Sequence, residues 1–145
     1  MNGYLLDTNI ISSLFPSTAR SSIALAEWLE GIEANGGFFL SAVTIHEIEK
    51  GICLLERKGA STKAGNLRIW LSGLLATYDD RIIAVDKQVC SISGMLEAAS
   101  IAAGHNPGLA DALIAGSAKV HQLVVVTKNR RHFQSFGIEL LTPAP

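Results

Sequence analysis

A short apolar run that ends on a carboxylate constrains the fold of this 145-residue chain more than any other feature. Residues 4–6 are apolar and too few for a helix, and Asp7, Thr8 and Asn9 follow them directly. Side-chain oxygens of these three types accept hydrogen bonds from the first N–H groups of a helix. The stretch therefore predicts a buried strand that passes into a helix at an acid, which in open α/β sheets is where ligands bind.

The same alternation of strand and helix continues along the chain. Apolar runs predict further strands at residues 38–40, 81–85, 123–126 and 138–141, and helical patterns occupy residues 10–15, 22–32, 41–58, 60–78, 86–103 and 109–121. Connections of this length imply right-handed crossovers between parallel strands. We therefore expect one domain over residues 1–145, an α/β fold with helices on both faces of a mostly parallel sheet of four to five strands.

Composition agrees with such a fold and excludes several classes of protein. The hydrophobic share is 48%, as expected for a sheet covered on both faces, yet no apolar run reaches the roughly 20 residues that a bilayer requires. The first residues lack the basic start and apolar core of a secretion signal, so we expect a cytoplasmic protein. A net charge of −1 argues against coating of nucleic acid through bulk positive charge.

Four residues with apolar neighbours are assigned to packing. Cys53 and Cys90 show no CxxC spacing and stand in apolar helical segments, which predicts buried free thiols. Trp28 and Trp70 lie at helical spacing with other apolar residues, which favours packing in the core or between subunits over stacking on bases.

Four polar side chains can gather at one edge of the predicted sheet. Asp7 follows the first strand, Glu47 lies in the helix after the second, Asp111 opens the helix before the fourth, and Asn129 follows the fourth. Carboxylates about 5 Å apart repel by roughly 3 kcal/mol at an effective dielectric near 20, so such a cluster would take up protons or a cation. Oxygen ligands suit Mg²⁺ or Mn²⁺, which can activate water to hydrolyse a phosphodiester.

Each acid also has a simpler structural interpretation. Asp7 could serve only as a helix cap, and Glu47 could complete a capping box with Thr44. Asp111 could merely favour a helix dipole, although its helix is apolar nearly all round, which indicates that this acid is partly buried. We expect Asp86, which follows the third strand, to cap a helix.

Four motifs in order carry a resemblance to a known family: LDTN at 6–9, SAVTIHE at 41–47, LADALIA at 109–115, and VTKN at 126–129 with HF at 132–133. Together they resemble the PIN-domain ribonucleases, and more narrowly the VapC-type, FitB-like toxins of bacterial type II toxin–antitoxin pairs. Each motif is loose alone, but four at the expected separations are specific. The resemblance covers nearly the whole chain.

That resemblance implies a PIN-like three-layer α/β/α sandwich and an endoribonuclease that depends on Mg²⁺ or Mn²⁺. It also implies a homodimer inhibited by an antitoxin protein, in a complex that binds operator DNA. Carried over to this chain, it makes Asp7, Glu47 and Asp111 the metal-binding acids and adds Asn129 to the catalytic set. Many relatives have Asp at the position of Asn129, and an amide coordinates or orients water without adding charge, so a second tightly bound ion is not implied.

A dense basic cluster follows the fourth predicted strand. Its position beside the acids suits phosphate contacts, and a solvated loop without a ligand is the alternative. The cluster consists of Lys128, Arg130, Arg131 and His132. The predicted substrate-binding residues are Thr8, Asn9, Thr127, Lys128, Arg130 and Arg131.

Two other functions compete with the nuclease. A phospho-receiver domain could use Asp7, Asp86, Thr127 and Lys128, but it leaves the acids at positions 47 and 111 without a role. A PIN-like protein that only binds its partner is the second, with catalysis lost through Asn129. The HExxH motif of zinc proteases and the glycine-rich nucleotide-binding loops are absent from the sequence.

Overall fold

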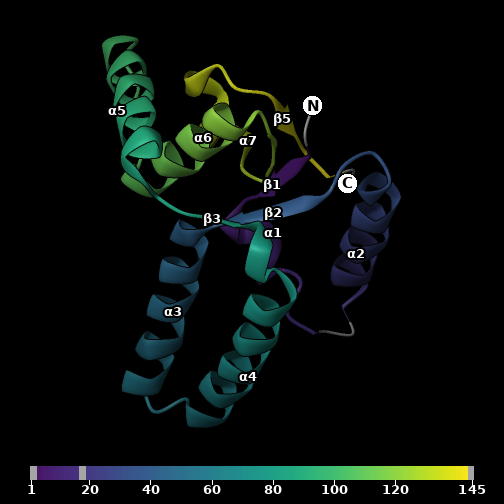
Figure 1. Cartoon of the computed structure of the whole chain (residues 1–145). Helices are drawn as coiled ribbons and strands as arrows, with labels where there is room; N and C mark the ends of the chain where they lie inside the picture. Colours follow the sequence, from purple (N-terminus) through teal and green to yellow (C-terminus); the bar gives the residue numbers. More distant parts are fainter. Residues whose placement is uncertain (1–2, 17–18, 144–145) are drawn as a thin grey trace.

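Five parallel strands form the centre of the molecule in the order β3-β2-β1-β4-β5 (Figure 1). The computed structural model describes residues 3–16 and 19–143. The strands are β1 (Tyr4–Leu6), β2 (Phe38–Ser41), β3 (Ile82–Ile83), β4 (Val124–Val126) and β5 (Leu140–Leu141). All four pairings are parallel, and in the central ones Leu5 lies opposite both Phe39 and Val125. The predicted parallel sheet is confirmed.

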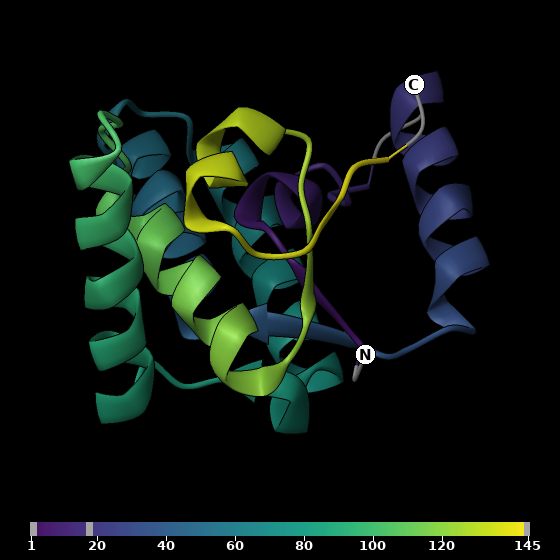
Figure 2. The ribbon, with the colours of Figure 1, turned by 90° about the horizontal axis from the view of Figure 1, so that it is seen from above.

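Helices cover both faces of this sheet. They are α1 (Thr8–Ser12), α2 (Arg20–Glu33), α3 (Ala42–Arg57), α4 (Ser61–Thr77), α5 (Lys87–Ala102), α6 (Leu109–His121) and α7 (Arg130–Phe133), with 3₁₀ turns η1 (Asp79–Arg81) and η2 (Gln134–Phe136). Helices α5, α6 and α7 lie on one side, and α3 and α4 extend from the other (Figure 1). Figure 2 shows α5 and α6 side by side, far from α2. The predicted three-layer sandwich is confirmed.

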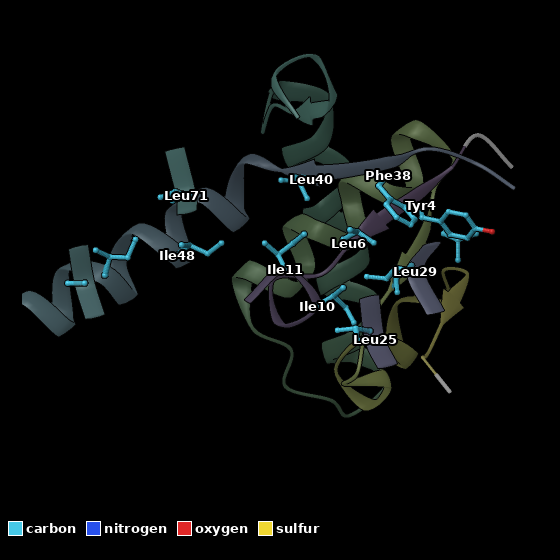
Figure 3. Packing of buried hydrophobic residues seen from close by; sticks show 14 residues of the cluster. Tyr4, Leu6, Ile10, Ile11, Leu25, Leu29, Phe38, Leu40, Ile48 and Leu71 are labelled. Atoms are coloured by element: carbon cyan, nitrogen blue, oxygen red, sulfur yellow. The ribbon is translucent and has the colours of Figure 1, made fainter. Parts of the chain in front are cut away.

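Alternation along β1 divides the core between the two faces. Tyr4 and Leu6 belong to a cluster of buried residues that extends over α1 to α4, and Ile10 and Leu29 lie near them in it (Figure 3). Leu5 packs on the opposite face against residues of α6 and α7, such as Ile114. Successive side chains of a strand point to opposite faces, so a fully apolar β1 requires helices on both.

Several element boundaries differ from those predicted. The strand expected over 81–85 is only two residues long, because it is an edge strand that pairs with Leu40 and Ser41 of β2 alone. The first helix begins at Thr8, two residues earlier than expected, because the Asp7 side chain caps it. A short helix, α7, occupies residues for which no helix was predicted.

Predictions about packing residues are confirmed for the tryptophans and wrong for the cysteines. Trp28 and Trp70 are partly buried against the cluster that contains Tyr4 and Leu6. The Trp70 ring also contacts Phe15 edge-on, with the ring centroids 5.5 Å apart. Cys53 and Cys90 are free as expected but exposed, because they lie on the solvent-facing sides of α3 and α5. Across the described ranges, no helix has the length and apolar character needed to span a bilayer.

Candidate active site

A cavity of about 620 Å³ opens at the edge of the sheet where β1 and β4 end. Six residues predicted from the sequence to form the site line it: Asp7, Thr8, Asn9, Glu47, Asp111 and Asn129. Three separate segments supply the acids, from the end of β1, the second turn of α3 and the first turn of α6. The structure thus brings the predicted catalytic set together.

Asp7 is the most buried of these acids, with 5% of the residue exposed. Its Oδ1 accepts a 2.8 Å hydrogen bond from the N–H of Thr8, and its Oδ2 accepts one of 2.8 Å from the hydroxyl of Thr127. Burial raises the pKa of Asp7 from 3.8 to about 6, and the charges of Asp111 and Glu47 add to this, against the opposing effect of the two hydrogen bonds. Asp7 therefore caps α1 and also faces the other acids.

Glu47 reaches from α3 to α1 and takes no part in capping its own helix. Ser41 is the N-cap of α3, where its Oγ accepts a 3.1 Å hydrogen bond from Val43 N–H. Glu47 Oε1 instead accepts a 2.6 Å hydrogen bond from the hydroxyl of Thr8, which also lies 2.9 Å from Thr44 Oγ1. The capping-box interpretation is wrong, and the two threonines hold the Glu47 carboxylate at the cavity.

Asp111 is partly buried in the first turn of α6, as its apolar neighbours predicted. Burial raises its pKa, His132 opposes this effect, and the charge of Glu47 adds to it. His132 Nδ1 lies 3.4 Å from Asp111 Oδ2. In the sequence, His132 was assigned to the basic cluster and to a family motif. Its pairing with Asp111 was not foreseen, because it depends on α7, which was not predicted.

The residues after β4 have three different environments. Thr127 is fully buried and bonded to Asp7, so the prediction that it binds substrate is wrong and its role is to position that acid. Lys128 Nζ donates a 2.6 Å hydrogen bond to Ser13 Oγ, which ties the loop to α1. Arg131 lines a neighbouring cavity, whereas Arg130 is exposed and lines neither.

The comparison with known proteins decides the family. The model of the PIN domain matches residues 4–138 of this chain. The chain belongs to the PIN-domain family. This PIN domain is 29% identical over 139 residues to Toxin FitB of Neisseria gonorrhoeae and 28% identical over 142 residues to VapC ribonuclease Y4jK of Sinorhizobium fredii, with 96% of each chain covered in both cases.

Solved structures agree with this assignment. The crystal structure of FitAcB from Neisseria gonorrhoeae superposes on this PIN domain with a TM-score of 0.83, at 28% sequence identity and over 97% of each chain. The predicted family resemblance is therefore confirmed. It also displaces the phospho-receiver hypothesis, and Asp86, one of the residues that hypothesis required, caps α5 by accepting a 2.9 Å hydrogen bond from Val89 N–H.

The acids of this PIN domain fit a hard divalent cation in chemical type. Carboxylate and amide oxygens line the cavity, and these are the ligands that Mg²⁺ and Mn²⁺ prefer. Within residues 3–16 and 19–143, no three His, Cys, Asp or Glu side chains form a group that could hold a metal ion as they stand. Asp7, Glu47 and Asp111 thus share a cavity without forming a preassembled site.

Proposed function

We propose that this protein is an endoribonuclease dependent on Mg²⁺ or Mn²⁺ and the toxin of a toxin–antitoxin pair. The observation that carries the proposal is the convergence of Asp7, Glu47 and Asp111 on one cavity at the carboxyl edge of the sheet. Similarity to proteins named Toxin FitB and VapC ribonuclease supports the class of activity. The three carboxylates would hold the cation, which when bound polarises the phosphodiester and supplies an activated water.

The surrounding hydrogen bonds prepare the acids for this task. Thr127 and the Thr8 N–H fix both oxygens of Asp7, and the Thr8 hydroxyl orients Glu47. The Asn129 side chain adds an amide to the cavity wall, where it can orient water or a phosphate oxygen without adding charge. The protein's own contribution is therefore three carboxylates around one cavity, two of them oriented by hydrogen bonds, whose mutual repulsion a cation would relieve as it draws them together.

We test the activity with single-stranded RNA, Mg²⁺ and a chelator. The parent protein should cleave in Mg²⁺ and stop in the chelator. Asp7→Asn and Asp111→Asn should each slow cleavage about a hundredfold or more, because several kcal/mol of charge stabilisation depend on the ligands. Asp80→Asn is the matched control, since Asp80 is exposed in η1 and lies outside the cavity. Equal cleavage by the parent and the two cavity variants would overturn the proposal.

The alternative is a PIN domain that only binds its partner, and the same experiment tests it. This alternative predicts no cleavage by the parent protein in either metal, with activity appearing in Asn129→Asp, because that substitution adds the missing carboxylate. Cleavage by the parent chain excludes it.

We further propose that the protein forms a homodimer and binds an antitoxin protein, in a complex that binds operator DNA. An arginine of the antitoxin would enter the acidic cavity, because a bidentate guanidinium can satisfy carboxylates that otherwise hold the metal. Titration of Mg²⁺ against the preformed complex should weaken the antitoxin's binding. The absence of competition at any Mg²⁺ concentration would contradict this arrangement.

A further inference from the structure

A second cavity of about 400 Å³ adjoins the acidic one. The two cavities share Gly108, Asp111 and His132 in their walls, so they are contiguous on the surface beside α6 and α7. These helices lie close together above the sheet (Figure 1). A ligand that fills the acidic cavity can therefore continue into the second one.

The chemistry of this second cavity differs from that of the first. Its lining includes Arg131, His105 and Asn106, all three of which are exposed. Its single acid is Asp111, whose charge is already opposed by His132 at 3.4 Å. The second cavity thus has one carboxylate and one guanidinium in its lining, where the first has three carboxylates and no arginine or lysine.

Arg131 is the residue from which the chemistry of the ligand can be inferred. In the part of the chain that the structure describes, its side chain makes no hydrogen bond or ion pair. A guanidinium is always charged and binds phosphate oxygens in bidentate fashion, so an unpartnered one beside a nuclease cavity is suited to a phosphate.

We propose that the second cavity binds the RNA phosphate next to the scissile one, with Arg131 as its main contact. This inference rests on the proposed function, because it takes the acidic cavity as the place of the scissile phosphate. Successive phosphates of one strand are separated by a single nucleotide, and the shared wall at His132 makes the second cavity the adjacent position for a strand that crosses the site. The acids repel a phosphate in the absence of a cation, so Arg131 supplies an attraction that the first cavity lacks.

The test measures RNA binding without turnover. Fluorescence anisotropy of a short labelled single-stranded RNA is followed in Ca²⁺ while KCl is raised from about 50 to about 200 mM. Arg131→Gln should weaken binding about tenfold at low salt, as expected for the loss of a hydrogen-bonded charge pair. It should also reduce the slope of log affinity against log salt by about 0.7, the contribution of one phosphate contact to a single strand.

Two further variants separate charge from geometry. Arg131→Lys should keep the salt slope, because the charge remains, and recover only part of the affinity, because a lysine cannot bind in bidentate fashion. Arg57→Gln is the control of equal charge change at the far end of α3 and should match the parent protein.

The outcomes distinguish this inference from the proposed function. If Arg131→Gln binds RNA with the affinity and salt slope of the parent, the inference is wrong, even where the parent cleaves RNA. If Arg131→Gln instead loses affinity only for the antitoxin, the cavity is a protein-binding site and the inference is also wrong. A loss of RNA affinity in Arg131→Gln supports the inference independently of whether cleavage occurs.

Discussion

The Thr127 hydroxyl donates a 2.8 Å hydrogen bond to Asp7 Oδ2, across a separation of 120 residues in the sequence. The bond forms because β1 and β4 pair in parallel with Leu6 opposite Val126, so the next residue of each strand meets at the same edge. Burial raises the pKa of Asp7, and the hydrogen bond from Thr127 partly offsets this by lowering it. Thr127 thereby favours the charged form of Asp7, which is the form that a divalent cation would bind.

Replacement of Thr127 tests this link. Thr127→Val should raise the pKa of Asp7 further, because the carboxylate loses a donor, and should destabilise the protein by about 1–3 kcal/mol, because buried groups lose their partners. Those groups include the N–H of Asn129, which donates to Thr127 Oγ1 at 2.9 Å. A carboxyl NMR titration and urea unfolding measure the two effects. Thr127→Ser keeps the hydroxyl and is the control, and an unchanged pKa of Asp7 in the Val variant would contradict the link.

Asp7 should make stability depend on pH. Its pKa is 3.8 in the unfolded reference and about 6 in the folded protein. The folded state therefore retains a proton that the unfolded state releases between these values, and the free energy of unfolding falls as pH rises through this window. At neutral pH the cost of a charged Asp7 is roughly 3 kcal/mol, from about 1.4 kcal/mol for each pKa unit.

Asp7→Asn removes this cost and loses about 1 kcal/mol of hydrogen bonding, because the amide keeps only one acceptor oxygen. The variant should therefore gain about 2 kcal/mol of stability near pH 7.5 and none near pH 3, below both pKa values. Urea unfolding in a chelator, at both pH values, measures the difference. A gain of equal size at the two pH values would show that the charge of Asp7 is not its cause.

The Thr8 hydroxyl should matter for activity more than for stability. It donates a 2.6 Å hydrogen bond to Glu47 at the cavity. Thr8→Val removes the donor and should slow RNA cleavage and weaken Mn²⁺ binding by roughly ten- to a hundredfold, the usual cost of losing a group that orients a metal ligand. Thr8→Ser should retain both. A Val variant with parental metal affinity would show that Glu47 does not depend on Thr8.

Helices α5 and α6 pack so closely at Gly116 that an added methyl group there should destabilise the protein. A Cβ on Gly116 of α6 would overlap Ser93 Oγ of α5 and lie 2.9 Å from Ser93 Cβ. Gly116→Ala should cost about 1–3 kcal/mol of stability through overpacking. Ser93→Ala should be neutral or stabilising, since the buried Ser93 Oγ has no hydrogen-bond partner among the described residues, and should recover part of the loss in the double variant. Additive thermal shifts in the four proteins would contradict the contact.

The strands and the helices that follow them could be predicted, because apolar runs and capping residues mark them in the local sequence. The apolar runs and the acids that follow them placed Asp7, Glu47 and Asp111 at one edge, because the carboxyl ends of parallel strands point the same way. The partners of these acids were not predictable, since Thr127, Thr8 and His132 reach them only through tertiary contacts. The exposure of Cys53 was missed for the same reason, because the composition of α3 does not state which of its faces packs on α4.

The most direct measurement is the position of Mn²⁺ in crystals of the protein, located by its anomalous scattering. We expect one strong peak in the cavity, with carboxylate oxygens of Asp7, Glu47 and Asp111 as ligands or bonded to its waters. The same crystals of Asp7→Asn should show the peak weakened or lost. A Mn²⁺ peak elsewhere, or a Glu47 or Asp111 side chain turned to the opposite side of the molecule from Asp7, would show that these three acids do not form a metal site.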